Sequence, residues 1–232
     1  MTVPAVIATA PPAQPDRLLD QDRMLDHLPD TVATIITLPS TEGRPVSGAV
    51  SISDVVAGAR RADGVPGLTL ENLPGRDLEA DELAELAASV AADPGRWAGH
   101  VAFSDDQRHY VSLHRDTHVD VWLLCWTPRN DTGWHDHDIS SGAVAVTQGT
   151  LTEHNLAVGA PSMSTDVPAG LVFAFGPDHI HRLTGRDAGS VSIHAYSPPL
   201  WRMGQYTVSH SGMLRRRSVS YADELRPLDD MA

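Results

Sequence analysis

The segment GAVAVTQGTLTEHN, residues 142–155, contains two short runs on either side of Gly149 in which β-branched residues recur at every second position. Alternation with a period of two is typical of a strand with one buried face, and a glycine between two such runs indicates a turn. Runs of the same kind recur after Trp97, as HVAFS, HYVSLHR, VDVWLLCW, GLVFAFG and SVSIHAYS. Many short strands separated by turn residues predict an antiparallel β-sandwich or barrel over residues 97–210.

The chain before Trp97 has a different pattern. Residues 77–92, DLEADELAELAASVAA, place Leu83, Leu86 and Val90 near one helical face behind an acidic first turn. They predict a helix, which the following Asp-Pro-Gly ends. The segment SISDVVAGARR, residues 51–61, predicts a second, shorter helix.

These patterns divide the chain into four parts. Residues 1–20 are rich in Pro and Ala and are predicted to be disordered. Residues 21–96 form an N-terminal extension that carries the helix, residues 97–210 form the barrel, and residues 211–232 form a C-terminal tail. The predicted fold is therefore mostly β, with an α-helical N-terminal region.

Composition excludes several classes of protein. The formal net charge is −13 and the sequence contains no lysine, so a nucleic-acid partner is not expected. No apolar run is long enough to span a membrane, and the N-terminus lacks the basic region of a secretory signal. The run Arg215–Arg217 is interpreted as a solvated segment. Cys125 is the only cysteine and lies in an apolar run, so we expect a small core residue and a reducing cytoplasm.

The chain has twelve histidines, and eleven of them lie in the predicted barrel, from His100 to His210. His135 and His137 are two residues apart, so in a strand both side chains point to one face and could share a metal ion. Asp136 points away from that face and is expected to brace the neighbouring strand. His179 and His181 repeat the spacing, and one of them could complete a set of three. Three imidazoles suit Fe, Zn, Cu or Ni.

The stretch from Arg115 to Pro199 resembles the thiol dioxygenase family, whose best-known member is cysteine dioxygenase. The resemblance lies in HDH at 135–137, HR at 181–182, SIHAYSPP at 192–199 and LLCW at 123–126. It implies a cupin-type (jelly-roll) β-barrel with one Fe(II) ion. The implied metal ligands are His135, His137 and His181, with His179 as a polar neighbour or a partner of a ligand.

The same resemblance implies roles for further residues. Ser192, His194 and Tyr196 match the family's outer-sphere chain, and their i, i+2, i+4 spacing puts them on one face of a strand. Arg115 matches the residue that binds the substrate carboxylate, with Arg108 as a rival.

One alternative and one departure from the family concern these roles. Arg115 could instead be a surface residue paired with Asp116 or Asp120. Mammalian members carry a cysteine cross-linked to the tyrosine at the position of Gly142, so Tyr196 is expected to have no thioether bond, as in bacterial members.

The resemblance thus implies an iron-dependent thiol dioxygenase that adds both atoms of O2 to the sulfur of a small thiol, with L-cysteine favoured. Its partners are the thiol and dioxygen. Two other functions stay open at this stage. One is a different metal-dependent cupin enzyme, either a non-thiol dioxygenase or an isomerase. The other is a non-catalytic cupin that binds a ligand without converting it.

Overall fold

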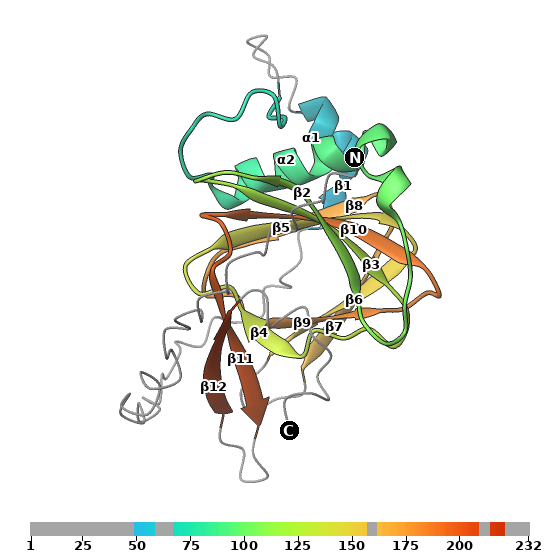
Figure 1. Ribbon diagram of the computed structural model, residues 1–232, viewed down its shortest axis with the longest axis vertical. Coiled ribbons are helices and arrows are strands. Elements are labelled where there is room, and N and C mark those ends of the chain that lie inside the picture. The colour runs from blue at the N-terminus through green and yellow to red at the C-terminus, as the bar shows by residue number, and fades with distance from the viewer. Residues whose placement is uncertain (1–48, 59–66, 157–161, 209–213, 221–232) are drawn as a thin grey trace, which may run out of the picture. The chain divides into compact units, whose positions relative to one another are not determined.

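A computed structural model describes residues 49–58, 67–156, 162–208 and 214–220 (Figure 1). All of them belong to one compact unit, residues 41–232. The predicted disordered segment, residues 1–20, lies outside the described residues. Among the helices that are described, none combines the length and the apolar character needed to cross a membrane.

Two six-stranded antiparallel sheets face each other in this unit (Figure 1). The strands of the first sheet, in spatial order, are β1 (Val50–Ser51), β8 (Leu171–Phe175), β5 (Ser141–Gln148), β10 (Ser190–Ser197), β3 (Asp120–Trp126) and β2 (His109–Arg115). The strands of the second are β12 (Leu214–Ser220), β11 (Arg202–Val208), β4 (Trp134–Asp136), β9 (His181–Gly185), β6 (Thr150–Asn155) and β7 (Met163–Pro168). The expectation of a mostly β fold built from antiparallel strands is confirmed.

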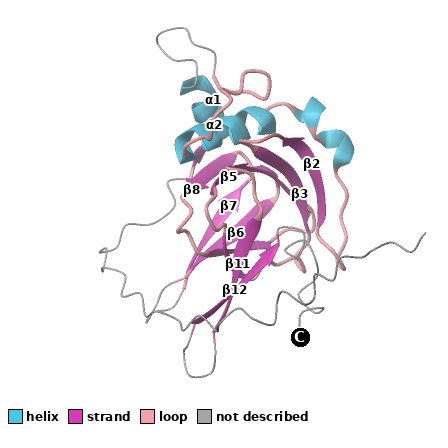
Figure 2. Cartoon of the chain, turned by 60° about the vertical axis from the view of Figure 1, so that its left-hand side comes forward, coloured by secondary structure: helices cyan, strands magenta, loops and turns pink. Residues whose placement is uncertain are grey.

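The helices cover the outer face of the first sheet (Figure 2). They are α1 (Ile52–Gly58), α2 (Ala80–Ala91) and the 3-10 turns η2 (Pro94–Arg96) and η3 (Ala98–His100). Leu83, Leu86 and Val90 of α2 are buried against the sheet, as their spacing predicts. The helix begins at Ala80 rather than Asp77, because Glu79 and Glu82 form a capping box at its N-terminus.

Side-chain alternation along β10 separates the core from the candidate site. All eight of its residues are buried, because the strand lies between β5 and β3 in the middle of the sheet. Ile193 and Ala195 pack in the apolar cluster beneath α2, whereas Tyr196 belongs to a second apolar cluster that includes residues from both sheets. Cys125 belongs to the cluster beneath α2, in agreement with its predicted role as a core residue.

Both ends of the described chain add strands to the sheets. β1, from the predicted N-terminal extension, pairs with β8 at the edge of the first sheet. β12, from the predicted C-terminal tail, pairs with β11 along its whole length. The sequence LRRRSVS of β12 has little apolar alternation, so only its pairing with β11 identifies it as a strand.

Candidate metal centre and pocket

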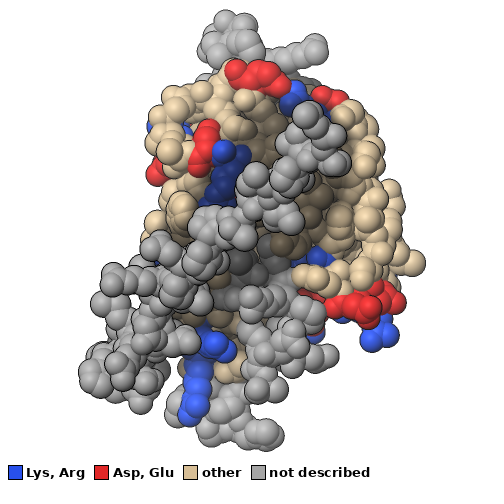
Figure 3. Space-filling model, in the orientation of Figure 1, with Lys and Arg blue, Asp and Glu red and all other residues tan. Residues whose placement is uncertain are grey.

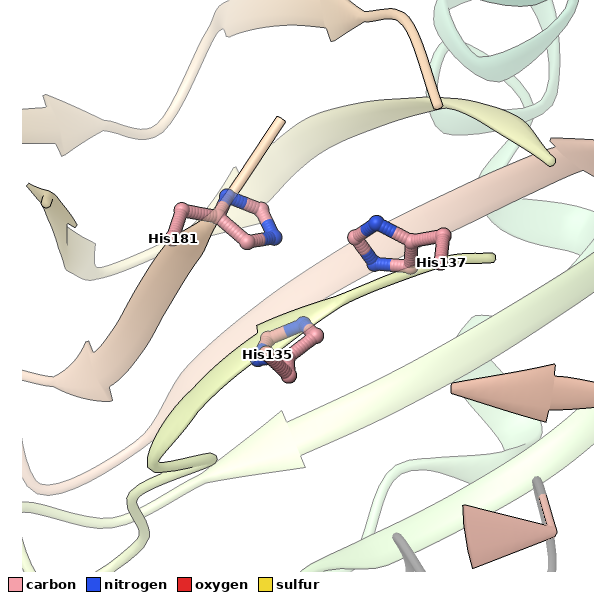
Figure 4. A group of neighbouring side chains, drawn as sticks. All are labelled: His135, His137 and His181. Carbon is pink, nitrogen blue, oxygen red and sulfur yellow. The ribbon is translucent and has the colours of Figure 1, made fainter. Parts of the chain in front are cut away.

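Three histidines converge between the two sheets (Figure 4). His135 belongs to β4, His137 follows directly after that strand, and His181 opens β9, where it pairs with His135. Their ring centroids lie 4.7 to 5.2 Å apart, and one nitrogen from each lies within 4.8 Å of the others. The predicted shared face of His135 and His137 is therefore observed, and this cluster could hold a metal ion.

The hydrogen bonds of the three rings engage some of their nitrogens and leave others available to bind a metal ion. His135 donates from Nδ1 to the carbonyl oxygen of Gly133 at 3.1 Å, and His181 donates from Nδ1 to Glu153 Oε1 at 2.9 Å. Nε2 of His181 and both ring nitrogens of His137 are buried without a hydrogen-bond partner among the described residues. Such buried groups are costly unless something binds them, so the donor set fits a metal with three nitrogen ligands.

Burial also sets the protonation of these rings. It lowers the pKa of His137 well below its ordinary value, and it lowers the pKa of His181 to about 3. Both imidazoles are therefore neutral at physiological pH. A neutral ring offers the lone pair that a metal ligand needs.

Glu153 is a buried carboxylate behind the histidines. Its Oε1 accepts hydrogen bonds from His181 Nδ1 and, at 3.0 Å, from His179 Nε2. Burial opposes ionisation, but the bonds from the two histidines outweigh it and hold the pKa of the carboxyl at about 2. His179 is thus a partner of Glu153, and Glu153 orients His181 in the way that carboxylates orient metal-binding histidines.

Sequence reasoning missed Glu153, although a signal was present. Leu151 and Glu153 share one face of β6, and both are buried. A carboxylate at an inward position of an alternating strand needs a partner, because an unpaired buried charge is strongly unfavourable.

Ser192, His194 and Tyr196 form a continuous hydrogen-bonded chain on the inner face of β10. Ser192 Oγ lies 2.8 Å from His194 Nε2, and His194 Nδ1 lies 3.1 Å from the Tyr196 hydroxyl. Trp126 donates from Nε1 to Ser192 Oγ at 2.9 Å. The structure thus brings together the three residues of the predicted chain and adds Trp126 to it.

Two tautomers of His194 satisfy these contacts. Burial holds the pKa of His194 well below its ordinary value, so the ring is neutral and carries one proton. Ser192 Oγ accepts from Trp126, and with its second lone pair and its own proton it can either accept from His194 Nε2 or donate to it. With the ring proton on Nδ1, His194 donates to the oxygen of Tyr196 and the phenol keeps its own proton for another acceptor; with the ring proton on Nε2, the phenol donates to His194.

A pocket of about 40 Å³ opens beside these groups. Its polar lining includes Arg108, Thr132, His135, His194 and Tyr196, and its apolar lining comprises Trp122, Leu124, Trp126, Leu183, Leu200 and Met203. Arg108 is 7% exposed, and its guanidinium carbon lies 4.7 Å from the centre of the Trp126 ring.

Arg115 lies outside the pocket lining. Its Nη1 donates to Asp120 Oδ2 at 2.5 Å, and its Nη2 donates to the carbonyl oxygen of Leu200 at 3.3 Å. Asp120 is fully buried, so its carboxylate depends on this arginine as a counter-ion. Of the two arginines named from the sequence, the structure therefore brings Arg108, rather than Arg115, to the pocket.

Gly142 lies opposite Tyr196 across the β5–β10 pair. A Cβ atom at this position would come within 2.5 Å of the Phe175 ring and 3.1 Å of Tyr196 Cδ1. Phe175 thus fills the space beside Tyr196 that a side chain at position 142 would need.

Comparisons with known proteins found similar sequences and structures. A proline–tRNA ligase of Mycolicibacterium smegmatis is 31% identical over 183 residues, which make up 69% of this chain but only 30% of that protein. A double-stranded β-helix protein from Klebsiella pneumoniae matches 51% of this chain and 91% of its own, with 13% identity and a TM-score of 0.39. A cupin superfamily protein from Desulfitobacterium hafniense matches 44% and 86%, with 13% identity and a TM-score of 0.37.

The family model of cysteine dioxygenase type I matches residues 53–209, a span that contains all three clustered histidines, the Ser192–His194–Tyr196 chain and Arg108. That span is well over half of the 232 residues. The chain therefore belongs to the cysteine dioxygenase type I family and has a cupin fold.

Proposed function

We propose that this protein is an Fe(II)-dependent dioxygenase that oxidises a small carboxylate-bearing thiol, with L-cysteine favoured, to its sulfinic acid. The observation that carries the proposal is that His135, Tyr196 and Arg108 line one pocket, and that His137 and His181 cluster with His135. A metal enzyme acting on a non-thiol substrate would need the histidines, but it would have no use for the hydrogen-bonded chain that ends at Tyr196.

The metal would be held by His135, His137 and His181. Fe(II) bound there would supply open coordination positions for a thiolate and dioxygen, and the electrons through which the two react. Glu153 adds a negative charge behind His181 and so strengthens that ring as a ligand. Burial keeps the rings of His137 and His181 neutral, and hydrogen bonds to Gly133 and Glu153 orient those of His135 and His181.

Arg108 is our choice for the substrate carboxylate. Its guanidinium lies at the pocket, largely withdrawn from solvent and stacked on Trp126, where a planar cation can hold a carboxylate through two parallel hydrogen bonds. The sequence-based choice, Arg115, would have to leave the buried carboxylate of Asp120 to do the same. A substrate bound at Arg108 would present its sulfur toward the histidines.

Tyr196 is the proposed hydrogen-bond donor at the reacting end of the substrate. His194, which is hydrogen-bonded to Ser192 through its other ring nitrogen, holds the Tyr196 hydroxyl in place. A donor fixed in advance stabilises negative charge that develops during reaction without the cost of reorientation. Both atoms of one dioxygen molecule end on sulfur, so RSH becomes RSO2H and no further reductant is required.

Oxygen consumption by the Fe(II)-loaded protein tests the proposal. The thiols to compare are L-cysteine, 3-mercaptopropionate and cysteamine, with mass spectrometry of each product and with His135→Ala as the matched control. We expect uptake with L-cysteine, a mass gain of two oxygen atoms, and loss of both iron and activity in the variant. Iron-loaded protein that consumes no oxygen with any thiol would contradict the proposal.

A further inference from the structure

The β11–β12 hairpin binds the acidic residue between the first two histidines. Asp136 Oδ2 accepts hydrogen bonds from Arg216 Nε at 2.7 Å and from the Tyr206 hydroxyl at 2.5 Å. Its Oδ1 accepts from Arg216 Nη2 at 2.8 Å and from the backbone nitrogen of Gly204 at 2.9 Å. The expectation that Asp136 braces the neighbouring strand is confirmed. The interpretation of Arg215–Arg217 as a merely solvated segment is wrong for Arg216.

A second contact lies one residue beyond His137. Asp138 Oδ1 accepts from Arg216 Nη2 at 3.3 Å, and its Oδ2 accepts from Arg202 Nη2 at 3.2 Å. Asp138 has a φ of 57°, in the left-handed region, and its backbone nitrogen bonds to Asp136 Oδ1 at 2.9 Å. Arginines of the hairpin therefore hold both neighbours of His137.

Gly204 leaves room for this arrangement. A Cβ atom there would come within 2.2 Å of Arg216 Nε and 2.5 Å of Asp136 Oδ2. Only a residue without a side chain lets the guanidinium lie across the strand onto the carboxylate. Figure 3 shows basic side chains gathered at the lower end of the molecule, where Figure 1 places β11 and β12.

Strand β4, which contains His135 and is followed by His137, makes few other pairings with its neighbours. β4 is three residues long, and its pairing with β9 is limited to His135 opposite His181. Its pairing with β11 covers all three residues. The side chain of Asp136 therefore adds a charged, bidentate connection to the one neighbour that pairs with the whole strand.

We propose that Arg216 is a positioning residue for the metal centre, which it stabilises by holding Asp136 and Asp138 and, through them, His135 and His137. This inference rests on the proposed three-histidine metal site. It predicts that metal affinity depends on a side chain of the C-terminal hairpin that touches no ligand.

Binding of Co(II) alone, without any thiol, tests the inference. The apo protein is titrated under nitrogen while the visible absorption of Co(II) is followed, and release to a chelator gives the dissociation rate. Arg216→Ala should weaken Co(II) binding by roughly 10-fold and change the shape of the absorption band, because partners behind the ligands typically contribute such factors. Arg216→Lys, which keeps the charge but loses the planar fork, should recover part of the loss.

Arg217→Ala is the matched control, since Arg217 is an exposed neighbour on the same strand. We expect its Co(II) affinity and spectrum to match those of the wild type. Should Arg216→Ala fail to fold, Tyr206→Phe removes a single hydrogen bond from Asp136 and should weaken binding by roughly threefold.

The outcomes separate this inference from the proposed function. Unchanged affinity and an unchanged spectrum in Arg216→Ala, while His135→Ala abolishes binding, would overturn the positioning role and leave the metal site intact. A wild-type chain that binds no Co(II) would overturn the three-histidine site itself. A lower melting temperature with an unchanged Co(II) spectrum would reduce Arg216 to a purely structural residue and would also overturn the inference.

Discussion

Replacing Arg108 and Arg115 one at a time should separate substrate binding from stability. Arg108→Met keeps an unbranched side chain that can pack on Trp126 but removes the cation from the pocket. Hydrogen bonds to a charged group contribute about 1.5–3 kcal/mol, so loss of the guanidinium should lower kcat/KM for L-cysteine by roughly 100-fold.

Cysteamine is the informative second substrate, because it has the thiol and the amine of cysteine but no carboxylate. Removing Arg108 takes away nothing that cysteamine binds, and it removes a cation that repels the ammonium group. Its kcat/KM should therefore stay the same or rise in Arg108→Met. The ratio of the two specificity constants, measured by oxygen uptake, cancels any general loss of folded or iron-loaded protein.

Arg115→Met should behave in the opposite way. It leaves the fully buried Asp120 carboxylate without its counter-ion, while Arg115 itself is 26% exposed. Breaking a buried pair costs about 3–5 kcal/mol, and partial exposure to solvent reduces that figure, so we expect a free energy of unfolding lower by about 2 kcal/mol. Urea denaturation measures the loss, and the cysteine-to-cysteamine ratio should not change.

The reverse pattern would refute this reasoning. If Arg115→Met lost the preference for cysteine and Arg108→Met kept it, the sequence-based choice of Arg115 would be correct. Asp120→Asn in the Arg115→Met background is the control for the buried charge, and it should restore part of the lost stability.

Three further changes test the surroundings of the site. Glu153→Gln keeps the size of the side chain but removes its charge, so affinity for Fe(II) should fall roughly 10-fold in competition with a chromophoric chelator, and equal affinity would contradict the role given to the carboxylate. The metal-free protein should lose stability as the pH falls from 6.5 to 5, because the folded-state pKa of His181 is lowered to about 3. Above the unfolded-state pKa of about 6.5, the histidine is neutral in both states and the free energy of unfolding does not depend on it. Below that pH the unfolded chain binds a proton that the folded protein does not, so the free energy of unfolding falls until the pH reaches the folded-state pKa. The loss is therefore about 2 kcal/mol from His181 at pH 5, and a urea midpoint that is independent of pH would rule it out. Gly142→Ala places a methyl group within 2.5 Å of Phe175, so thermal unfolding should report a loss of about 1–3 kcal/mol, and an unchanged melting temperature would show that the ring moves aside freely.

Much of the fold could be read from short-range patterns. Alternation in SVSIHAYS predicted a buried strand with Ser192, His194 and Tyr196 on one face, and β10 has that form. Helical spacing predicted α2 to within three residues at either end. The HDH spacing placed His135 and His137 on one face for the same reason, since the direction of a side chain along a strand depends only on local geometry.

The role of each charged partner depended on contacts between distant strands. β2 contains a bulge between Ser112 and His114, and Arg115, which follows it, lies opposite Asp120. The preference for Arg115 over Arg108 rested on the family's spacing from the HDH motif, and that spacing contains no information about the bulge. Bulges shift the facing of every later residue in a strand, and they leave little trace in a single sequence.

The sequence by itself determined a mostly β chain, a helix against it and three histidines in family-like positions. Only the tertiary structure decided that Glu153 lies behind His181, that Arg108 reaches the pocket and that Arg216 holds Asp136. The physical reason is the range of the interactions. Periodicity reports which face a residue occupies within its own strand, whereas an ion pair or a buried hydrogen bond is defined by which strand comes to lie beside it.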